Sequence, residues 1–158
     1  VMHRGKVWAI DTTGDAAAKR ILTVHVRGRK LPTAPLATSD EVRAVAEIRW
    51  ARMPRSIPHQ GVLRFTNDST DNHVLVMIKL AKGKTMRDFR RWVNTGARTR
   101  PPFSSHEFSF GVLSPNSRMA ATYSQPRGRY VVLCFWPDAD QHGQPHFLMG
   151  MYRGIRLT

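Results

Sequence analysis

Apolar residues fall in short runs along most of this chain, and turn-forming residues separate the runs. The clearest pattern is the segment 41–50, in which Val42, Ala44, Ala46, Ile48 and Trp50 alternate with other residues. Alternation of this kind is typical of a strand with one buried face. Similar patterns predict strands at 21–26, 62–67, 73–80, 107–112, 118–123, 130–136 and 147–157. Short strands at this spacing favour an all-β fold, an antiparallel sandwich or barrel.

The segments between the strand patterns add further predictions. The polar residues 68–72 form a short loop, which indicates that the strands on either side of it are antiparallel neighbours. The segment 53–61 is a turn-rich connector, and 11–14 is typical of a turn. Pro32 and Pro35 lack backbone donors, so 31–36 cannot form a central strand.

One segment has the pattern of a helix rather than a strand. Thr85 and Asp88 resemble a capping box, in which the Thr hydroxyl accepts a hydrogen bond from the third backbone amide. Apolar residues follow at helical spacing, and Gly96 can terminate the helix. We therefore expect a short inserted helix from about Thr85 to Asn94, packed through Met86, Phe89 and Val93. Its exposed basic face would contain Arg87, Arg90, Arg91 and Arg98.

Length and charge limit the alternatives. At 158 residues, 41% of them hydrophobic, the chain is large enough for one domain with a core and too short for two of ordinary size. Twenty-five Lys and Arg against eleven Asp and Glu give a net charge of +14. A positive field of this size favours an acidic partner, an anionic lipid surface or nucleic acid.

The densest basic segment argues against nucleic acid. It comprises Arg87, Arg90, Arg91, Arg98 and Arg100. The aromatic residues within it, Phe89 and Trp92, fall on the predicted buried face of the helix. An exposed base-stacking platform would need them at the surface. A solvated basic surface is the favoured interpretation.

Location and redox compartment are less constrained. No apolar stretch approaches the roughly 20 residues that a membrane helix needs. The opening Val1-Met2-His3-Arg4-Gly5 does not resemble a natural start, which is compatible with a processed export signal or a trimmed membrane anchor. The single cysteine excludes an intramolecular disulfide, so cysteine usage does not report the compartment.

The most specific chemical signal lies near the end of the chain. Cys134, His146 and Met151 offer a soft thiolate, an imidazole and a thioether, which are typical ligands of a mononuclear copper site. His73, at the start of an apolar run, is the candidate for a second imidazole. On a strand over 130–136, Tyr130 and Cys134 share one face. No Ser-His-Asp or paired-carboxylate arrangement competes with this set, so we expect no enzyme.

The arrangement resembles the cupredoxins, the plastocyanin-like copper proteins. The resemblance rests on Gly128-x-Tyr130-x-x-x-Cys134, on Ile57-Pro-x-x-Gly61-x-x-x-Phe65-x-Asn67, and on an ending typical of one bacterial group. That ending is Cys134-Phe-Trp-Pro-Asp138 followed by Pro145-His-Phe-Leu-Met-Gly-Met151. The resemblance covers about residues 44–158. It implies a Greek-key β-sandwich over 41–158, with 1–40 as an N-terminal extension that contains an edge strand.

The resemblance also implies a function. One copper ion would be held by His73, Cys134, His146 and a weak axial Met151, with Met149 as the rival for the axial place and His142 as a rival for His146. The expected protein carries single electrons, or holds copper, outside the cytoplasm. An acidic redox partner or an anionic membrane-surface complex would suit its charge, and no small-molecule substrate is expected. The alternative is a metal-free cupredoxin-like binding module, and nucleic-acid binding is a distant third.

Overall fold

The structure is a computed structural model that describes residues 5–10, 21–27, 37–51 and 53–158. The chain forms two compact units, Val1–Pro35 and Leu36–Thr158. In the first unit, β1 (Gly5–Ile10) pairs with β2 (Ile21–Val26) as an antiparallel hairpin. The predicted strand at 21–26 is therefore confirmed. The turn expected at 11–14 and the proline segment 31–36 lie outside the described residues.

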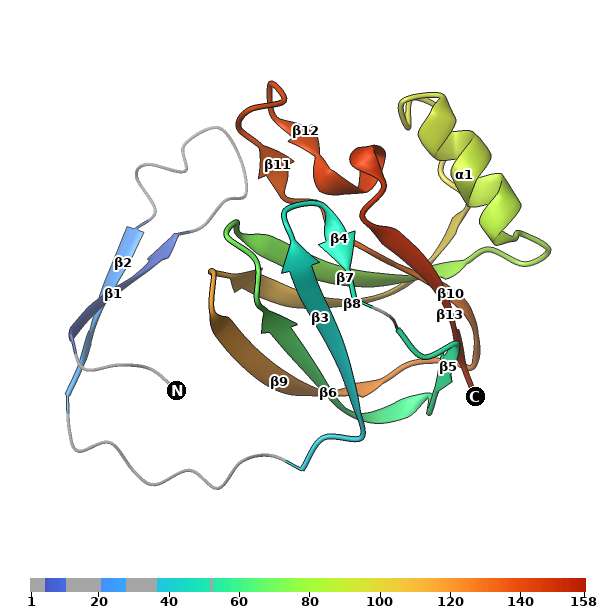
Figure 1. The fold of residues 1–158 in the computed structure, drawn as a ribbon. Coiled ribbons are helices and arrows are strands. Elements are labelled where there is room, and N and C mark those ends of the chain that lie inside the picture. The colour runs from blue at the N-terminus through green and yellow to red at the C-terminus, as the bar shows by residue number, and fades with distance from the viewer. Residues whose placement is uncertain (1–4, 11–20, 28–36, 52) are drawn as a thin grey trace. The chain divides into compact units, whose positions relative to one another are not determined.

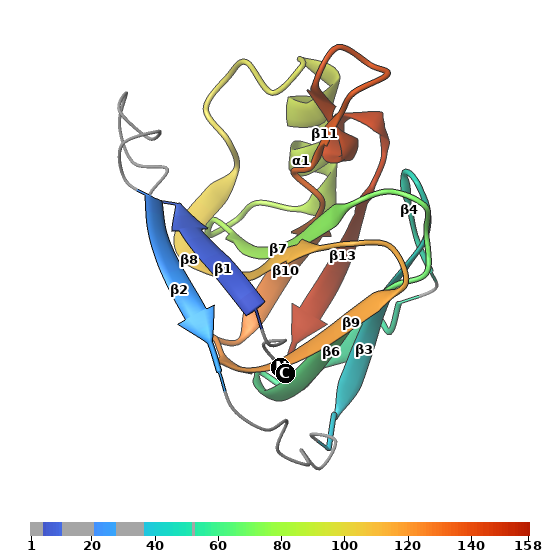
Figure 2. The same ribbon diagram turned by 90° about the vertical axis from the view of Figure 1, so that its left-hand side faces the viewer.

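The second unit contains two facing sheets (Figures 1 and 2). The four-stranded sheet has the order β4 (Arg49–Trp50), β3 (Asp40–Ala46), β6 (Gln60–Asn67), β9 (Ser117–Ser124). The five-stranded sheet has the order β5 (Ser56–Ile57), β13 (Tyr152–Leu157), β10 (Gly128–Leu133), β7 (His73–Leu80), β8 (Phe103–Leu113). A small hairpin, β11 (Pro137–Asp138) with β12 (Gln144–Pro145), precedes a 3-10 helix at His146–Met149. The predicted all-β sandwich with one short helix is confirmed, although β3–β6 and β5–β13 pair in parallel.

The five-stranded sheet is buried on both faces. Along β10, Tyr130 and Val132 point into the core between the sheets, in the same cluster as Cys134. Val131 and Leu133 belong to a second cluster on the opposite face, because successive side chains of a strand point to opposite sides. Burial on both faces explains why this strand is apolar almost without interruption. The shared face of Tyr130 and Cys134 follows the prediction.

Helix α1 (Met86–Asn94) covers the second face. Its capping box is formed as expected: Thr85 Oγ1 accepts from Arg87 N–H, and Asp88 Oδ2 accepts from Thr85 N–H at 2.9 Å. Phe89 is completely buried in the second cluster, a placement that contributes about 1.5–3 kcal/mol for such a side chain. In the described part of the chain, no helix has the length and apolar character needed to cross a bilayer.

The segment 41–50 corrects one prediction. It is a hairpin rather than a single strand: β3 ends at Ala46, and residues 47–48 turn the chain into β4. Ala44 and Trp50 become cross-strand partners, and both are buried. Directly paired residues lie on the same face of a sheet, so a tight hairpin preserves the alternation that indicated one long strand.

The loop 68–72 corrects a second prediction. Instead of joining antiparallel neighbours, it crosses from β6 in one sheet to β7 in the other. The buried Asn67 holds the crossing, because its Nδ2 donates to the carbonyls of Asp71 at 2.7 Å and Leu113 at 2.9 Å. The first bond satisfies a carbonyl of the loop, and the second ties Asn67 to the end of β8.

The strand predicted at 147–157 is also shorter than expected. Residues 146–149 form the 3-10 helix, and β13 begins at Tyr152. Gly150 has φ 107°, a left-handed backbone that ends the 3-10 helix and that residues with a Cβ rarely adopt. Met149 therefore lies on the 3-10 helix, not on a strand beside Met151.

Candidate metal centre

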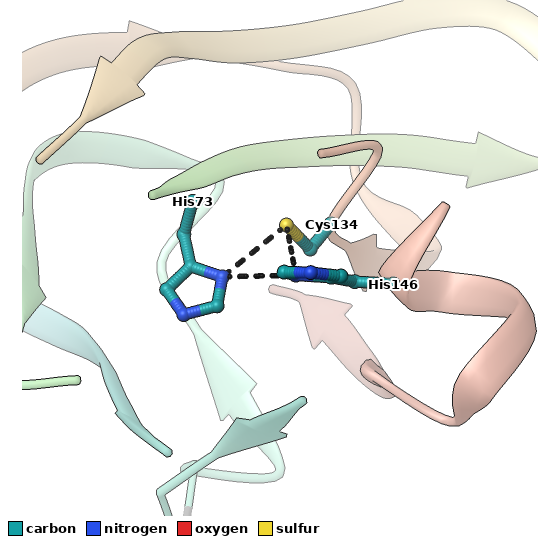
Figure 3. A group of neighbouring side chains, drawn as sticks. All are labelled: His73, Cys134 and His146. Atoms are coloured by element: carbon teal, nitrogen blue, oxygen red, sulfur yellow. Dashed lines mark hydrogen bonds between the residues drawn. The ribbon is translucent and has the colours of Figure 1, made fainter. Parts of the chain in front are cut away.

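Three predicted ligands meet inside the sandwich. Cys134 Sγ lies 3.6 Å from His73 Nδ1 and 3.6 Å from His146 Nδ1, and the two nitrogens are 3.2 Å apart (Figure 3). All three residues are fully buried. A point equidistant from these atoms lies about 2.0 Å from each, close to the roughly 2.0–2.3 Å of metal–imidazole and metal–thiolate bonds. The triangle therefore fits a small transition-metal ion.

Separate elements bring the three side chains together. His73 is the first residue of β7, Cys134 directly follows β10, and His146 opens the 3-10 helix. Backbone bonds close the intervening loop: His146 N–H donates to Trp136 O at 2.9 Å, and Phe147 N–H donates to Cys134 O at 2.9 Å. The β11–β12 hairpin forms the rest of this loop. The pairing and the two backbone bonds hold His146 beside Cys134.

Burial sets the charge of the three groups. It raises the pKa of the Cys134 thiol to about 11, although backbone N–H groups of Val74 and Trp136 oppose this. Burial, with the nearby His146, lowers the pKa of His73 to about 4. Burial also lowers the pKa of His146, against the opposing charges of Asp71, Asp138 and Glu47. Near neutral pH, three uncharged groups with lone pairs thus face one another.

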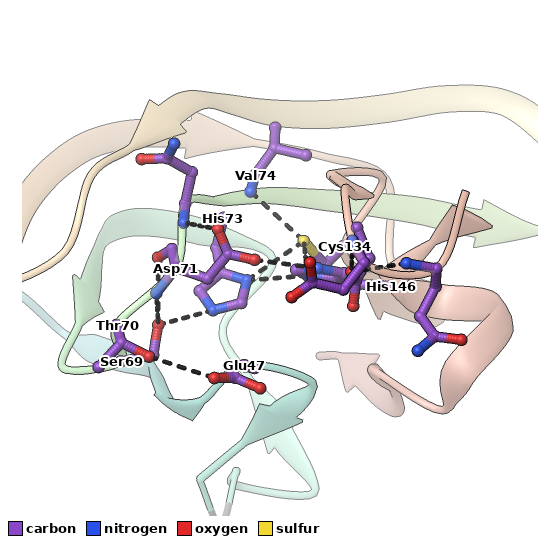
Figure 4. A network of polar contacts seen from close by, with 12 residues as sticks. Glu47, Ser69, Thr70, Asp71, His73, Val74, Cys134 and His146 are labelled. Atoms are coloured by element: carbon purple, nitrogen blue, oxygen red, sulfur yellow. Dashed lines mark hydrogen bonds and ion pairs between the residues drawn. The ribbon is translucent and has the colours of Figure 1, made fainter. Parts of the chain in front are cut away.

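The loop before His73 orients its ring (Figure 4). Ser69 Oγ lies 2.8 Å from His73 Nε2 and donates its own hydrogen to Asn67 Oδ1 at 2.7 Å. The hydroxyl oxygen is then the acceptor for His73 Nε2–H, which leaves the Nδ1 lone pair aimed at Cys134. Hydrogen bonding of the outer nitrogen is how proteins fix the tautomer of a ligating histidine.

A carboxylate lies beside the second imidazole. Asp71 Oδ2 is 3.4 Å from His146 Nε2. Among the described residues, however, His146 Nε2 has no hydrogen-bond partner of good geometry. Asp71 therefore acts through its charge in this arrangement. Sequence reasoning missed Ser69 and Asp71. The signal available was the polar composition of 68–72, just before the predicted ligand His73.

The fourth predicted ligand is close to the triangle in the chain and in space. Met151 is fully buried and belongs to the same core cluster as Cys134. Its N–H donates to His146 O at 3.0 Å, and its carbonyl accepts from Cys134 N–H at 3.2 Å. Met149, on the 3-10 helix, is only half-buried, and His142 is exposed on the loop.

The fold of this chain is similar to that of solved protein structures. No protein-family model and no curated protein sequence matches the chain. Dithionite-reduced auracyanin from the photosynthetic bacterium Roseiflexus castenholzii is 20% identical over 77% of this chain and 98% of its own, with a TM-score of 0.51. Auracyanin B is 18% identical over 79% and 93%, at a TM-score of 0.47. Auracyanin A, a "blue" copper protein from Chloroflexus aurantiacus, is 15% identical over 75% and 96%, at 0.46. The first similarity shows that this chain adopts the cupredoxin fold.

Proposed function

We propose that the protein is a type 1 copper protein that carries single electrons. The observation that supports this proposal is the buried triangle of Cys134 Sγ, His73 Nδ1 and His146 Nδ1, with sides of 3.6, 3.6 and 3.2 Å. Two imidazoles and one thiolate, with a weak axial thioether, are the donor set of blue-copper electron-transfer sites. Met151 would be the axial donor.

Each residue has a defined part in this function. Bound copper would supply a one-electron couple between its cuprous and cupric states. Cys134 would supply the negative thiolate after losing its proton, and His73 and His146 the neutral imidazoles. Soft sulfur suits the cuprous state and nitrogen the cupric state, so one fixed donor set serves both. The buried backbone bonds around the loop keep these donors in place.

Burial favours electron carriage over copper delivery or a metal-free role. A delivery site has to release its ion, whereas all three donors here have no exposed surface. In a metal-free module, the two facing imidazole Nδ1 atoms would bring no stabilisation in return for their burial. The proposed role is electron transport and involves no catalysed reaction.

The proposal includes a location and a partner class. The protein would work outside the cytoplasm, as a secreted or membrane-associated carrier. Its net charge of +14 would attract an acidic redox partner, or the anionic face of a membrane complex, and speed their encounter.

Titration of the purified metal-free protein with cupric ion tests the proposal. A single ion should bind and produce intense visible absorption, because a short Cu–thiolate bond gives strong charge transfer. Cys134→Ala should abolish the band, whereas His142→Gln, at an exposed histidine of the same loop, should leave it unchanged. A folded wild-type protein without a thiolate band would overturn the copper function.

A further inference from the structure

Helix α1 presents a dense cationic surface. Arg87, Arg90 and Arg91 on the helix are exposed, and so are Arg98 and Arg100 just beyond it. We call these five side chains the arginine face. The opposite side of α1 is occupied, since Phe89 is fully buried and Met86 and Val93 pack against the second core cluster. The predicted division into a buried apolar side and an exposed basic side is confirmed.

An aromatic stack joins this helix to the metal centre. The rings of Trp92 and Phe147 are parallel, with 3° between their planes and 5.7 Å between their centroids. Phe147 directly follows His146, and its N–H donates to the Cys134 carbonyl at 2.9 Å. Phe135, the residue after Cys134, packs edge-on against Phe147 at 5.0 Å. Trp92 of α1 thus stacks directly on Phe147, which follows the proposed ligand His146. Phe147 in turn contacts Phe135, which follows the proposed ligand Cys134.

Negatively charged side chains lie beside the proposed metal site, near His146. Glu47, Asp71, Asp138 and Asp140 line one pocket there, and no Lys or Arg is among the described residues that line it. His146 itself has no exposed surface. An acidic partner would be repelled from this pocket and could not touch the imidazole directly, so its favourable approach is over α1.

We propose that the arginine face of α1 is the docking surface for an acidic one-electron carrier protein. This inference rests on the proposed copper function and names the surface that serves it. Guanidinium groups match protein carboxylates because they can form two parallel hydrogen bonds with each. The exchange moves one electron and breaks no bond: the partner loses or gains the electron that the site gains or loses.

The same surface is less suited to a membrane or to nucleic acid. A helix that lies on a bilayer inserts an exposed apolar side, and the apolar side of α1 is packed against the sheet. Single-stranded nucleic acid needs exposed aromatic rings for stacking, and Phe89 is buried while Trp92 lies half-buried in its stack.

Paramagnetic mapping tests the surface without copper. Hexacyanochromate(III), a redox-inert anion, should broaden the amide resonances of about residues 86–100 in the metal-free protein, and polyglutamate should displace it. The double substitution Arg87→Glu/Arg90→Glu should abolish both effects. It should also preserve the helix, since a carboxylate in the first turn suits the helix dipole and can pair with Arg91. Arg49→Glu/Arg118→Glu, which changes the net charge equally on the other sheet, should leave the mapping unchanged.

Electron-transfer kinetics then link the surface to the site. Oxidation of the cuprous protein by hexacyanoferrate(III) at low salt should slow about tenfold in Arg87→Glu/Arg90→Glu and change little in the control. Equal slowing in both variants would overturn the docking surface. Tighter displacement of the probe by phosphatidylserine vesicles or single-stranded DNA than by polyglutamate would overturn the choice of a protein partner. Because mapping uses metal-free protein, failure of the copper titration would remove the electron role and leave the surface intact.

Discussion

Ser69 Oγ lies 2.8 Å from His73 Nε2, so a residue four positions earlier in the chain holds the outer nitrogen of a proposed ligand. Ser69→Ala should remove the hydrogen bond between the hydroxyl and that buried nitrogen. We expect the metal-free protein to lose about 1–3 kcal/mol of its free energy of unfolding. Copper affinity should fall roughly 10- to 100-fold, the usual effect of removing such a support.

Thr70→Ala is the matched control for Ser69. Thr70 is exposed, and among the described residues its hydroxyl reaches only Glu47, at 3.5 Å. Urea denaturation and competition with a copper chelator measure the two effects. Equal losses in both variants would mean that the loop as a whole, and not the bond to His73, supports the site.

Asp71→Asn should raise the reduction potential. The carboxylate is 3.4 Å from His146 Nε2, and its negative charge favours the more highly charged cupric state. The amide keeps the shape and removes the charge. Asp68→Asn is the control, because Asp68 is an exposed carboxylate on the same loop, paired with Arg43 at 2.6 Å. Spectroelectrochemical titration should show a clearly smaller change for the control, and a larger one would contradict the assignment.

The axial ligand can be assigned by two matched substitutions. Met151→Leu should keep copper bound and raise the reduction potential, since loss of a weak thioether destabilises the cupric state more than the cuprous state. Met149→Leu should alter packing alone, as Met149 is half-buried on the 3-10 helix. The reverse pattern would transfer the role to Met149, and no change in either would leave three ligands.

The metal-free protein should be most stable between about pH 6.5 and 9. His73 has a native pKa of about 4 against an ordinary 6.5, so between these values the unfolded chain binds more protons and stability rises with pH. Cys134 has a native pKa of about 11 against 9.0, so above pH 9 the unfolded chain loses its proton first and stability falls as pH rises.

Urea denaturation from about pH 4 to about pH 11 measures both the acid limb and the alkaline limb. Cys134→Ala should flatten the decline above pH 9 and leave the acid limb in place. An undiminished alkaline decline in that variant would show that other groups cause it.

Local patterns predicted much of this molecule, and the failures have one cause. The helix was predictable because its capping box and apolar spacing are contacts between near neighbours in the chain. The number of strands in 41–50 was not predictable, because a tight hairpin buries the same side chains as one long strand would. The partner of β6 was not predictable either, since the bonds that send 68–72 across the sandwich involve Leu113, distant in sequence.

The site divides in the same way. Its proposed ligands were chosen by residue type and by resemblance in their order along the chain. The supporting residues Ser69 and Asp71 belong to no such pattern, because a serine or aspartate in a polar loop is ordinary. Their importance depends on where His73 and His146 come to lie, which the tertiary structure determines.

The meeting of His73 and Cys134 in one triangle has a consequence for stability. His73 and Cys134 are 61 positions apart in the chain. An ion bound to both would cross-link them and close a loop that contains β7, α1, β8, β9 and β10. Such a closure restricts the unfolded chain much as a disulfide does, and long loops lose the most entropy. The protein has a single cysteine and cannot form an intramolecular disulfide. A bound metal ion would thus supply the cross-link that a disulfide supplies in other proteins.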